Sequence, residues 1–318
     1  MRLTVALCTY NPSSELLLRS LDAIVGQLET VKDAELIVVD NNSNPSLADR
    51  GYLGDYPLQL LEEPRQGLTA ARETAIRQAK GDVIVFVDDD NVLGEGYLEK
   101  VVSTFSKDTQ LGLLGGSVVA EYEQSPPEWF HEFEPQLAIR CYAPSVYVET
   151  EDIPYSDYFP VGAGFSVRRD LALAYLEDCE DTKRIEGRQG SVLSSGEDLD
   201  LGLFVLRTGH KLAVTGGLSV THVIPVGRVN SDYVVRLMVG TVKSTMELER
   251  KWSGRYGRPV FPFLTDSMAR LLAKTVAACA LSPWSTRNWI RYRVLKALAR
   301  TRLEARFASH AVAGGSPL

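Results

Sequence analysis

The chain has 318 residues, of which 45% are hydrophobic and 24% are charged. This length and apolar content are enough for a packed core, and they exclude an intrinsically disordered protein. The formal net charge of -7 argues against nucleic acid as the main partner, because a phosphate backbone is bound by a broad basic surface. We therefore expect one large globular domain, or such a domain with appendages.

Charge is distributed unevenly along the chain. Of the 34 Lys and Arg residues, 12 lie after residue 250, but of the 41 Asp and Glu residues only Asp266 and Glu304 do. Helical patterns with tryptophan dominate this basic tail, which is typical of a helix that binds an anionic membrane surface. Packing of the tail on the acidic body is the alternative.

The cysteines and the apolar runs predict a cytoplasmic protein. Four cysteines stand far apart without paired spacing, which indicates reduced thiols rather than disulfides or a zinc site. The first seven residues do not resemble a secretion signal. The longest apolar run, 271–281, contains Lys274 and is too short to span a bilayer. We expect a cytoplasmic protein, peripheral on the inner face of the plasma membrane if the tail binds lipid.

Strand and helix patterns alternate through the first 120 residues, which indicates an α/β fold with a mostly parallel sheet. Asn11 followed by Pro12 predicts the start of the first helix. The expected strands are 3–9, 36–40, 58–61, 83–87 and 111–120. One helix is expected after Asn11, and two more are expected over 68–79 and 95–105.

Three carboxylates follow one of these strands. Val83 to Val87 form an unbroken apolar run that ends in Asp88, Asp89 and Asp90. Three adjacent acids repel one another unless a cation or a set of donors receives them, and Mg²⁺ or Mn²⁺ fits best. A solvated turn is the alternative. Ligands of open α/β sheets bind at the carboxyl ends of the strands, so Asp40, which ends strand 36–40, is expected at the same crevice.

The helix predicted over 68–79 opens directly after Gly67, so its free N-H groups can receive a phosphate. The chain has neither a phosphate-loop lysine motif nor G-x-G-x-x-G, so an ATPase and a nicotinamide enzyme are unsupported. Residues 121–160 are rich in aromatics, including Trp129, for which packing is the alternative to stacking on sugar rings. Gly162 and Gly164 then permit a close approach of the backbone to a ligand.

A third acidic group lies in the segment from Ser194 to Leu201, which is expected to start a helix. Ser194 and Glu197 have the spacing of a capping box, and three acids in four residues exceed what capping requires. The helix end would keep Asp198 ionised, as a carboxylate that acts as a base must be. Strands are expected over 212–214 and 218–221. His222 follows them, and it is either a metal ligand or a structural residue.

Five ordered motifs together resemble family 2 glycosyltransferases of the GT-A fold. The resemblance covers about residues 1–225 and leaves the tail outside. One departure is Cys8, where the family usually has Pro. The motifs are Ala6-Leu7-Cys8-Thr9-Tyr10-Asn11, the segment from Glu35 to Ser43, Gly67-Leu68-Thr69-Ala70-Ala71-Arg72, the segment from Gly81 to Asp90, and Gly196-Glu197-Asp198-Leu199-Asp200.

The resemblance implies roles for individual residues. The D-x-D motif of the family maps to Asp88 to Asp90, with Asp90 on Mn²⁺ or Mg²⁺ and His222 as an additional metal contact. Asp198 matches the catalytic base. The expected nucleotide-sugar site consists of Thr9, Tyr10, Asn11, Asp40, Asn42, Gly67, Arg72, Asp88 and Asp89. The expected acceptor site consists of Trp129, Gly162, Gly164 and Glu197.

The resemblance implies a GT-A domain with a Rossmann-like, mostly parallel sheet and a C-terminal helical extension. Residues 1–120 would bind the nucleotide sugar, 121–230 the acceptor, and 231–318 form the basic extension. The implied activity is metal-dependent, inverting transfer from a UDP-, GDP- or dTDP-sugar to a glycan or lipid-linked acceptor, in cell-surface polysaccharide synthesis. The alternative is a non-catalytic subunit that binds sugar nucleotides or glycans. A nucleotidyltransferase would require a lysine-bearing, glycine-rich first loop, which Tyr10-Asn11-Pro12 is not.

Overall fold

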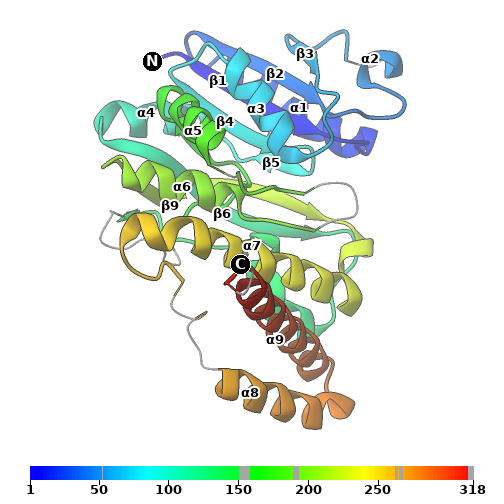
Figure 1. The fold of residues 1–318 in the computed structure, drawn as a ribbon. Coiled ribbons are helices and arrows are strands. Elements are labelled where there is room, and N and C mark those ends of the chain that lie inside the picture. Colours follow the sequence, from blue (N-terminus) through cyan, green and yellow to red (C-terminus); the bar gives the residue numbers. More distant parts are fainter. Residues whose placement is uncertain are drawn as a thin grey trace.

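The computed structural model describes residues 1–51, 53–149, 158–182, 184–188, 193–261, 264 and 268–313. Its centre is one sheet with the strand order β3-β2-β1-β4-β8-β6-β9-β5, and β7 pairs with β9. Helices cover the sheet. The two C-terminal helices lie at one end of the molecule, and strands β1, β2 and β3 lie at the opposite end (Figure 1). The architecture is the α/β fold expected from the sequence.

The amino-terminal half of the sheet is parallel. Its strands are β1 (Leu3–Thr9), β2 (Ala34–Asp40), β3 (Gln59–Glu62) and β4 (Val83–Asp88). All residues of β1 are buried, because alternate side chains enter cores on opposite faces of the sheet. One core contains α1 (Ser14–Leu28) and α4 (Tyr97–Lys107), and the other contains α3 (Leu68–Gln78), α5 (Arg169–Asp181) and α6 (Glu197–Arg207).

The second half of the sheet is mixed. Strand β8 (Ser166–Arg168) lies antiparallel between β4 and β6 (Leu111–Tyr122) and joins the two halves. Strand β9 (Lys211–Ile224) runs parallel to β6 and pairs antiparallel with β5 (Asn91–Leu93) and β7 (Val146–Glu149). This pairing brings His222 opposite Asn91, one residue after the acidic triplet.

Several element ends shift by one or two residues from the sequence-based expectation, and three further differences concern α1, α6 and β9. Helix α1 begins at Ser14, because Asn11 adopts a left-handed conformation and its side chain bonds the loop after β2. Helix α6 begins at Glu197, because the Ser194 hydroxyl bonds the Gly187 carbonyl and does not cap the helix. The two strands expected over 212–221 form the single strand β9.

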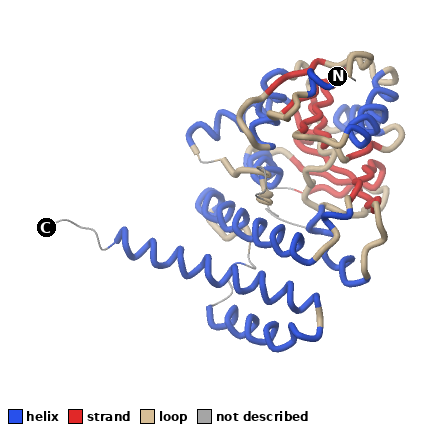
Figure 2. Tube along the Cα trace, turned by 90° about the vertical axis from the view of Figure 1, so that its right-hand side faces the viewer, coloured by secondary structure: helices blue, strands red, loops and turns tan. Residues whose placement is uncertain are grey.

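The C-terminal part is helical. Helix α7 (Ser231–Tyr256) is followed by α8 (Met268–Leu281), the short η4 (Ser282–Trp284) and α9 (Thr286–Ala313). Figure 2 shows α9 extending away from the sheet towards the C-terminus. Shorter elements are α2 (Leu47–Arg50), η1 (Glu128–Leu137) and η2 (Val226–Arg228). None of the helices within the described ranges has both the length and the apolarity needed to cross a bilayer.

A buried carboxylate fixes α6 to its neighbours. Asp200 is 0% exposed and accepts hydrogen bonds from Tyr175 Oη at 2.8 Å, Lys251 Nζ at 2.8 Å and Trp252 Nε1 at 2.7 Å. The backbone N-H of Ile185 donates to the same carboxylate at 3.3 Å. A buried charge is tolerated when it is paired and fully hydrogen-bonded, and here the donors come from α5, α7 and the segment between α5 and α6.

Replacing Asp200 by alanine should therefore destabilise the protein strongly. The change leaves Lys251 and Trp252 with buried donors that lack an acceptor, which costs about 3 kcal/mol or more of the free energy of unfolding. Urea denaturation, monitored by tryptophan fluorescence, measures this free energy of unfolding. The control is Asp55→Ala at an exposed turn, which should change stability by less than about 0.5 kcal/mol. Equal losses in the two variants would contradict this role of Asp200.

Candidate active site

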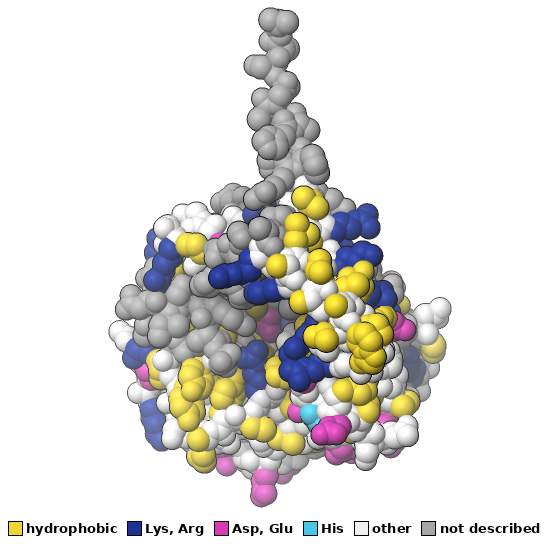
Figure 3. All heavy atoms as spheres, turned by 90° about the horizontal axis from the view of Figure 1, so that it is seen from below, with side chains coloured by type: hydrophobic (Ala, Val, Ile, Leu, Met, Phe, Trp, Pro, Cys, Tyr) yellow, Lys and Arg dark blue, Asp and Glu magenta, His cyan; other side chains and the backbone are white. Residues whose placement is uncertain are grey.

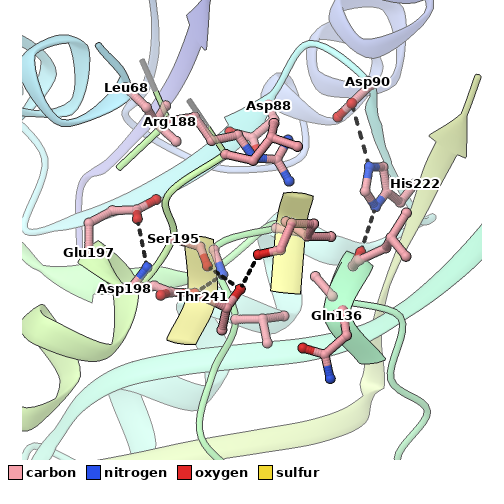
Figure 4. A pocket seen from close by; sticks show the side chains of 18 of the residues that line it. Leu68, Asp88, Asp90, Gln136, Arg188, Ser195, Glu197, Asp198, His222 and Thr241 are labelled. Atoms are coloured by element: carbon pink, nitrogen blue, oxygen red, sulfur yellow. Dashed lines mark hydrogen bonds and ion pairs between the residues drawn. The ribbon is translucent and has the colours of Figure 1, made fainter. Parts of the chain in front are cut away.

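The carboxyl end of β4 and the first turn of α6 line one cavity of about 480 Å³, a size typical of small-ligand sites. Asp88, Asp89 and Asp90 enter it from the β4 end, and Glu197 and Asp198 enter it from α6. Figure 4 shows Asp90 on one side of this cavity and Glu197 and Asp198 on the opposite side. Acidic groups more than 100 residues apart in sequence therefore share one space.

Arg72 joins these two acidic groups. Its guanidinium, on α3, donates to Asp88 Oδ1 at 3.4 Å, to Glu197 Oε1 at 3.2 Å and to the Gly162 carbonyl at 3.3 Å. The residue is only 6% exposed. Burial raises the pKa of Asp88 and of Glu197, although Arg72 lowers both. Burial opposes the charge on Arg72 itself, but Asp88 and Glu197 outweigh it and raise its pKa.

Asp89 is held by the end of β1. Its carboxylate accepts a hydrogen bond from the Thr9 hydroxyl, and its carbonyl accepts one from Ser20 Oγ at 3.1 Å. Burial raises the pKa of Asp89, and the neighbouring charge of Asp90 raises it further. Thr9 and Tyr10 both line the cavity, and Tyr10 is 44% exposed.

Asp90, His222 and Arg228 form a cluster at the other end of the triplet. Asp90 Oδ2 lies 3.5 Å from His222 Nε2 and 2.9 Å from Arg228 Nη1, and that Nη1 is 3.1 Å from His222 Nε2. Asn91 Nδ2 donates to Asp90 Oδ1 at 2.8 Å. Burial alone would raise the pKa of Asp90, but His222 and Arg228 hold it well below its usual range.

The donor atoms of this cluster fit a divalent ion. His222 Nδ1 lies 3.1 Å from the Leu137 carbonyl, which can only accept, so in the neutral form of the ring Nδ1 carries the proton and Nε2 is an acceptor, 3.1 Å from Arg228 Nη1. Two acceptor atoms thus converge where Arg228 places a positive charge. Within the described residues no group of three or more His, Cys, Asp or Glu surrounds one point. A catalytic Mg²⁺ or Mn²⁺ site often has only two protein ligands, because substrate phosphates supply others.

Asp198 lies in the first turn of α6 with both carboxylate oxygens hydrogen-bonded. Oδ2 accepts from the Gly162 N-H and Oδ1 from the Leu199 N-H, each at 2.8 Å. A Cβ on residue 162 would lie 3.2 Å from Arg72 Nη2, so a larger residue would crowd the guanidinium. The two N-H groups hold the carboxylate in place at the wall of the cavity.

Two predicted nucleotide residues point into the loop after β2. Asp40 is 2% exposed, and its carboxylate accepts from Ser43 N at 3.0 Å and Leu47 N at 2.7 Å. Asn11 donates its N-H to Ser43 Oγ at 2.8 Å, and its side-chain oxygen accepts from Asn44 N at 2.7 Å. Neither residue lines the cavity. Both shape the loop beside it.

Asn41 connects this loop to the start of α3. It is 3% exposed, lines the cavity and donates to the carbonyls of Glu63 at 3.1 Å and Arg65 at 2.6 Å. Its side-chain oxygen accepts from Gly67 N at 2.7 Å. Gly67 has φ +133°, a conformation that favours glycine, and its carbonyl accepts hydrogen bonds from the N-H groups of Ala70 at 3.0 Å and Ala71 at 3.2 Å. The exposed Asn42 lies outside the cavity lining.

Two predicted acceptor residues also lie outside the cavity lining. Trp129 packs edge-on against Phe130 and Phe133, with ring centroids 5.7 Å and 6.2 Å away. Gly164 has φ +72°, and its carbonyl accepts a hydrogen bond from Tyr97. The predicted residues that the structure brings together in the lining are Thr9, Tyr10, Arg72, Asp88, Asp89, Asp90, Gly162, Glu197, Asp198 and His222.

The cavity residues missed from the sequence include Asn41, Arg188 and Arg228. Asn41 directly follows Asp40, so its place after a strand was a usable signal. Arg228 lies six residues after His222, and Arg188 lies between α5 and α6, where its carbonyl accepts from the Leu68 N-H at 3.0 Å. Nothing in their sequence surroundings marks these arginines, because their roles depend on where the chain returns to the sheet.

Residues 4–173 match a family model described as glycosyl transferase family 2. The Haloferax volcanii protein named glucosyl-dolichyl phosphate glucuronosyltransferase is 26% identical over 137 residues, 42% of this chain and 43% of that protein. Glycosyltransferase AglE of the same organism is 34% identical over 123 residues, 37% and 40% of the two chains. The poly(ribitol-phosphate) beta-glucosyltransferase of Bacillus spizizenii is 31% identical over 143 residues, 43% and 22%. The chain thus matches less than half the length of each relative.

Two solved structures resemble the fold. GalNAc-T7, crystallised with UDP, GalNAc and Mn²⁺, gives a TM-score of 0.55 at 15% identity over 80% of this chain and 49% of that chain. TarS of S. aureus gives 0.50 at 16% identity over 78% and 40%. At this identity the likeness shows the fold alone, and it confirms the predicted GT-A fold. Because the family model covers more than half of the sequence, the chain belongs to glycosyl transferase family 2.

Proposed function

We propose that the protein is a metal-dependent, inverting glycosyltransferase that moves a sugar from a nucleoside diphosphate to a hydroxyl of a glycan or lipid-linked acceptor. The observation that carries the proposal is the single cavity lined by the acids after β4 and by those opening α6. Its volume of about 480 Å³ suits an activated sugar. The relatives named glucosyl-dolichyl phosphate glucuronosyltransferase and poly(ribitol-phosphate) beta-glucosyltransferase support a lipid-linked or polymeric acceptor and a role in cell-surface polysaccharide synthesis.

The donor side is proposed to be formed by residues 1–120. Thr9, Tyr10 and Arg72 line the cavity beside Asp88 and Asp89, so hydroxyl, aromatic and cationic groups are available to a nucleotide. The phosphate site expected at the start of α3 is not part of this proposal, because the Leu68 N-H already donates to the Arg188 carbonyl at 3.0 Å and the N-H groups of Ala70 and Ala71 donate to the Gly67 carbonyl. We propose UDP as the first nucleotide to test, because UDP is bound in the similar GalNAc-T7 structure.

The metal site is proposed to consist of Asp90 and His222. A carboxylate and a neutral imidazole together suit Mn²⁺ better than Mg²⁺, which prefers oxygen ligands alone. When bound there, the ion would neutralise the charge that develops on the leaving diphosphate. Arg228, which now bonds Asp90 at 2.9 Å, is close enough to supply a second positive charge to the same region.

The base is proposed to be Asp198. A sugar hydroxyl is a weak nucleophile, and a carboxylate within reach can accept its proton during attack on the anomeric carbon. Hydrogen bonds from Gly162 N and Leu199 N hold the carboxylate in place while it faces the cavity. Glu197 is a poorer candidate for the base, because its carboxylate already accepts a hydrogen bond from Arg72. A single displacement assisted by one base inverts the configuration of the sugar.

The acceptor side is proposed to be formed by residues 121–230. Gly162 lies at the wall of the cavity next to Asp198, and Gln136 and Leu137 of η1 line another part of it. We propose that the enzyme works at the inner face of the plasma membrane, where a lipid-linked acceptor would be presented. The basic C-terminal extension supports this location.

Asp198→Asn should abolish transfer and leave donor binding nearly intact, because the amide keeps the shape but cannot accept a proton. We expect turnover to fall by a factor of about 10² or more. The assay measures release of nucleoside diphosphate from a panel of donor sugars with Mn²⁺, and thermal stabilisation by the nucleotide measures binding. A non-catalytic binding subunit would be stabilised by a donor yet release nothing.

The matched control is Asp232→Asn, an exposed carboxylate in the first turn of α7. This variant should turn over like the wild type. Normal turnover in Asp198→Asn would refute the base assignment, whereas an absence of turnover from every donor in the wild type would refute the enzyme itself.

Arg228→Met should bind Mn²⁺ more tightly than the wild type in the absence of nucleotide. The guanidinium occupies the point on which Asp90 Oδ2 and His222 Nε2 converge, so a divalent ion must displace it. We expect about a tenfold gain, which corresponds to about 1.4 kcal/mol. Electron paramagnetic resonance of free Mn²⁺ measures this affinity without any turnover.

The control for this change is Arg236→Met, an exposed residue of α7 that stacks on Tyr233. Its Mn²⁺ affinity should equal that of the wild type. Asp90→Asn and His222→Ala should each weaken binding. Equal Mn²⁺ affinity in all four variants would show that the ion binds elsewhere.

A further inference from the structure

The two C-terminal helices differ in how they meet the rest of the protein. On α9, Ile290 and Val294 are buried in a cluster with η1 and α7. Arg287 and Arg291 of the same helix form ion pairs with Glu132 of η1. Packing on the acidic body, the alternative left open by the sequence, therefore accounts for α9.

Helix α8 is different, because most of its apolar side chains are exposed. Val276 is 69% exposed, Leu272 is 48% and Leu281 is 54%, and Trp284 in the following η4 is 80% exposed. Leu271 is buried, and α8 packs chiefly on α9 and η4. We call Leu272, Val276, Leu281 and Trp284 the α8 surface. Soluble proteins rarely leave a contiguous apolar patch of this kind without a partner.

The segment that carries the α8 surface is basic. No Asp or Glu occurs between Met268 and Leu303, whereas eight Lys or Arg do. Arg270 and Lys274 lie on α8 itself and are exposed. Figure 3, which views the molecule from the side on which α8 lies, shows a band of apolar side chains with Lys and Arg beside it. Apolar anchors flanked by cations are the pattern of a helix that lies in a membrane interface.

We propose that the α8 surface docks on an anionic lipid bilayer, with α8 lying in the plane of the interface. The apolar side chains would enter the boundary between headgroups and acyl chains, and the basic side chains would contact lipid phosphates. Fourteen residues are too few to span a bilayer, which fits a helix that lies on it. A second copy of the same surface is a poor occupant, because two such faces would bring like charges together.

The position of α9 connects this surface to the cavity. Helix α9 packs on α7 and η1, and these two elements also contribute Leu137 and Leu237 to the cavity wall. A bilayer bound by α8 would therefore be held at a fixed position relative to the cavity wall. This inference adds the contact surface to the membrane location proposed above, and it does not depend on the transfer reaction.

Sedimentation of the full chain with lipid vesicles tests the proposal. We expect binding to vesicles of phosphatidylcholine mixed with phosphatidylglycerol, weak binding to phosphatidylcholine alone, and loss of binding as salt increases. The double variant Val276→Ser, Trp284→Ala should lower the partition coefficient by about tenfold or more, because two large apolar contacts are removed. Trp284 also reports directly, since the tryptophan emission of the wild type should shift to the blue on vesicles.

The matched control is Val119→Ser, Val146→Ser, which removes two exposed valines from strands β6 and β7. It should partition like the wild type. Equal losses in the two double variants, or no preference of the wild type for anionic vesicles, would overturn the proposal. So would a vesicle-free dimer that the α8 variant dissociates, because the surface would then be a protein interface.

Release of nucleoside diphosphate from a soluble donor, measured without vesicles, separates this proposal from the proposed function. The α8 variant should release it at the wild-type rate. Absent vesicle binding with normal release would contradict the α8 surface alone. Normal vesicle binding with no release from any donor would contradict the enzyme alone.

Discussion

The buried guanidinium of Arg72 is the contact that allows the cavity to exist in this form. Five carboxylates line one space, and without a counter-charge their repulsion would separate the end of β4 from α6. Arg72 bonds one acid from each side, Asp88 at 3.4 Å and Glu197 at 3.2 Å. It also lies over the rings of Phe86 and Phe165, which exclude water and strengthen both ion pairs. One side chain thus bridges the end of β4 and the first turn of α6.

A second buried charge fixes the orientation of the base. Asp198 and Asp200 lie in the same helical turn, but Asp198 faces the cavity and Asp200 is bound by Tyr175, Lys251 and Trp252 behind it. These donors come from α5 and α7, so the first turn of α6 cannot rotate without breaking them. Rigid placement of a reacting group is a large part of catalysis. The acids at the start of α6 therefore have different roles: Asp200 is structural, and Asp198 is the proposed base.

The sequence predicted the parallel sheet, its helices and the acids at strand ends, because these depend on local periodicity and on where apolar runs stop. It could not predict that Asp40 turns into its own loop, since that depends on the N-H groups of Ser43 and Leu47. The place of Arg228 depends on β9 returning beside β5, a pairing of segments about 130 residues apart. Long-range pairing of this kind leaves no local pattern in the sequence.

The two arginines that pair with the cavity acids, Arg72 and Arg228, differ in how easily a ligand can displace them. Arg72 is buried against two aromatic rings and pairs with two carboxylates, so its contacts are costly to exchange. Arg228 follows the end of β9 on the short η2, and its side chain is 23% exposed. It can therefore leave Asp90 at lower cost, because water and a ligand phosphate can solvate it on release. The cavity thus combines a fixed charge pair at its centre with an exchangeable pair at the proposed metal site, which suits a site that holds its shape while a charged donor enters.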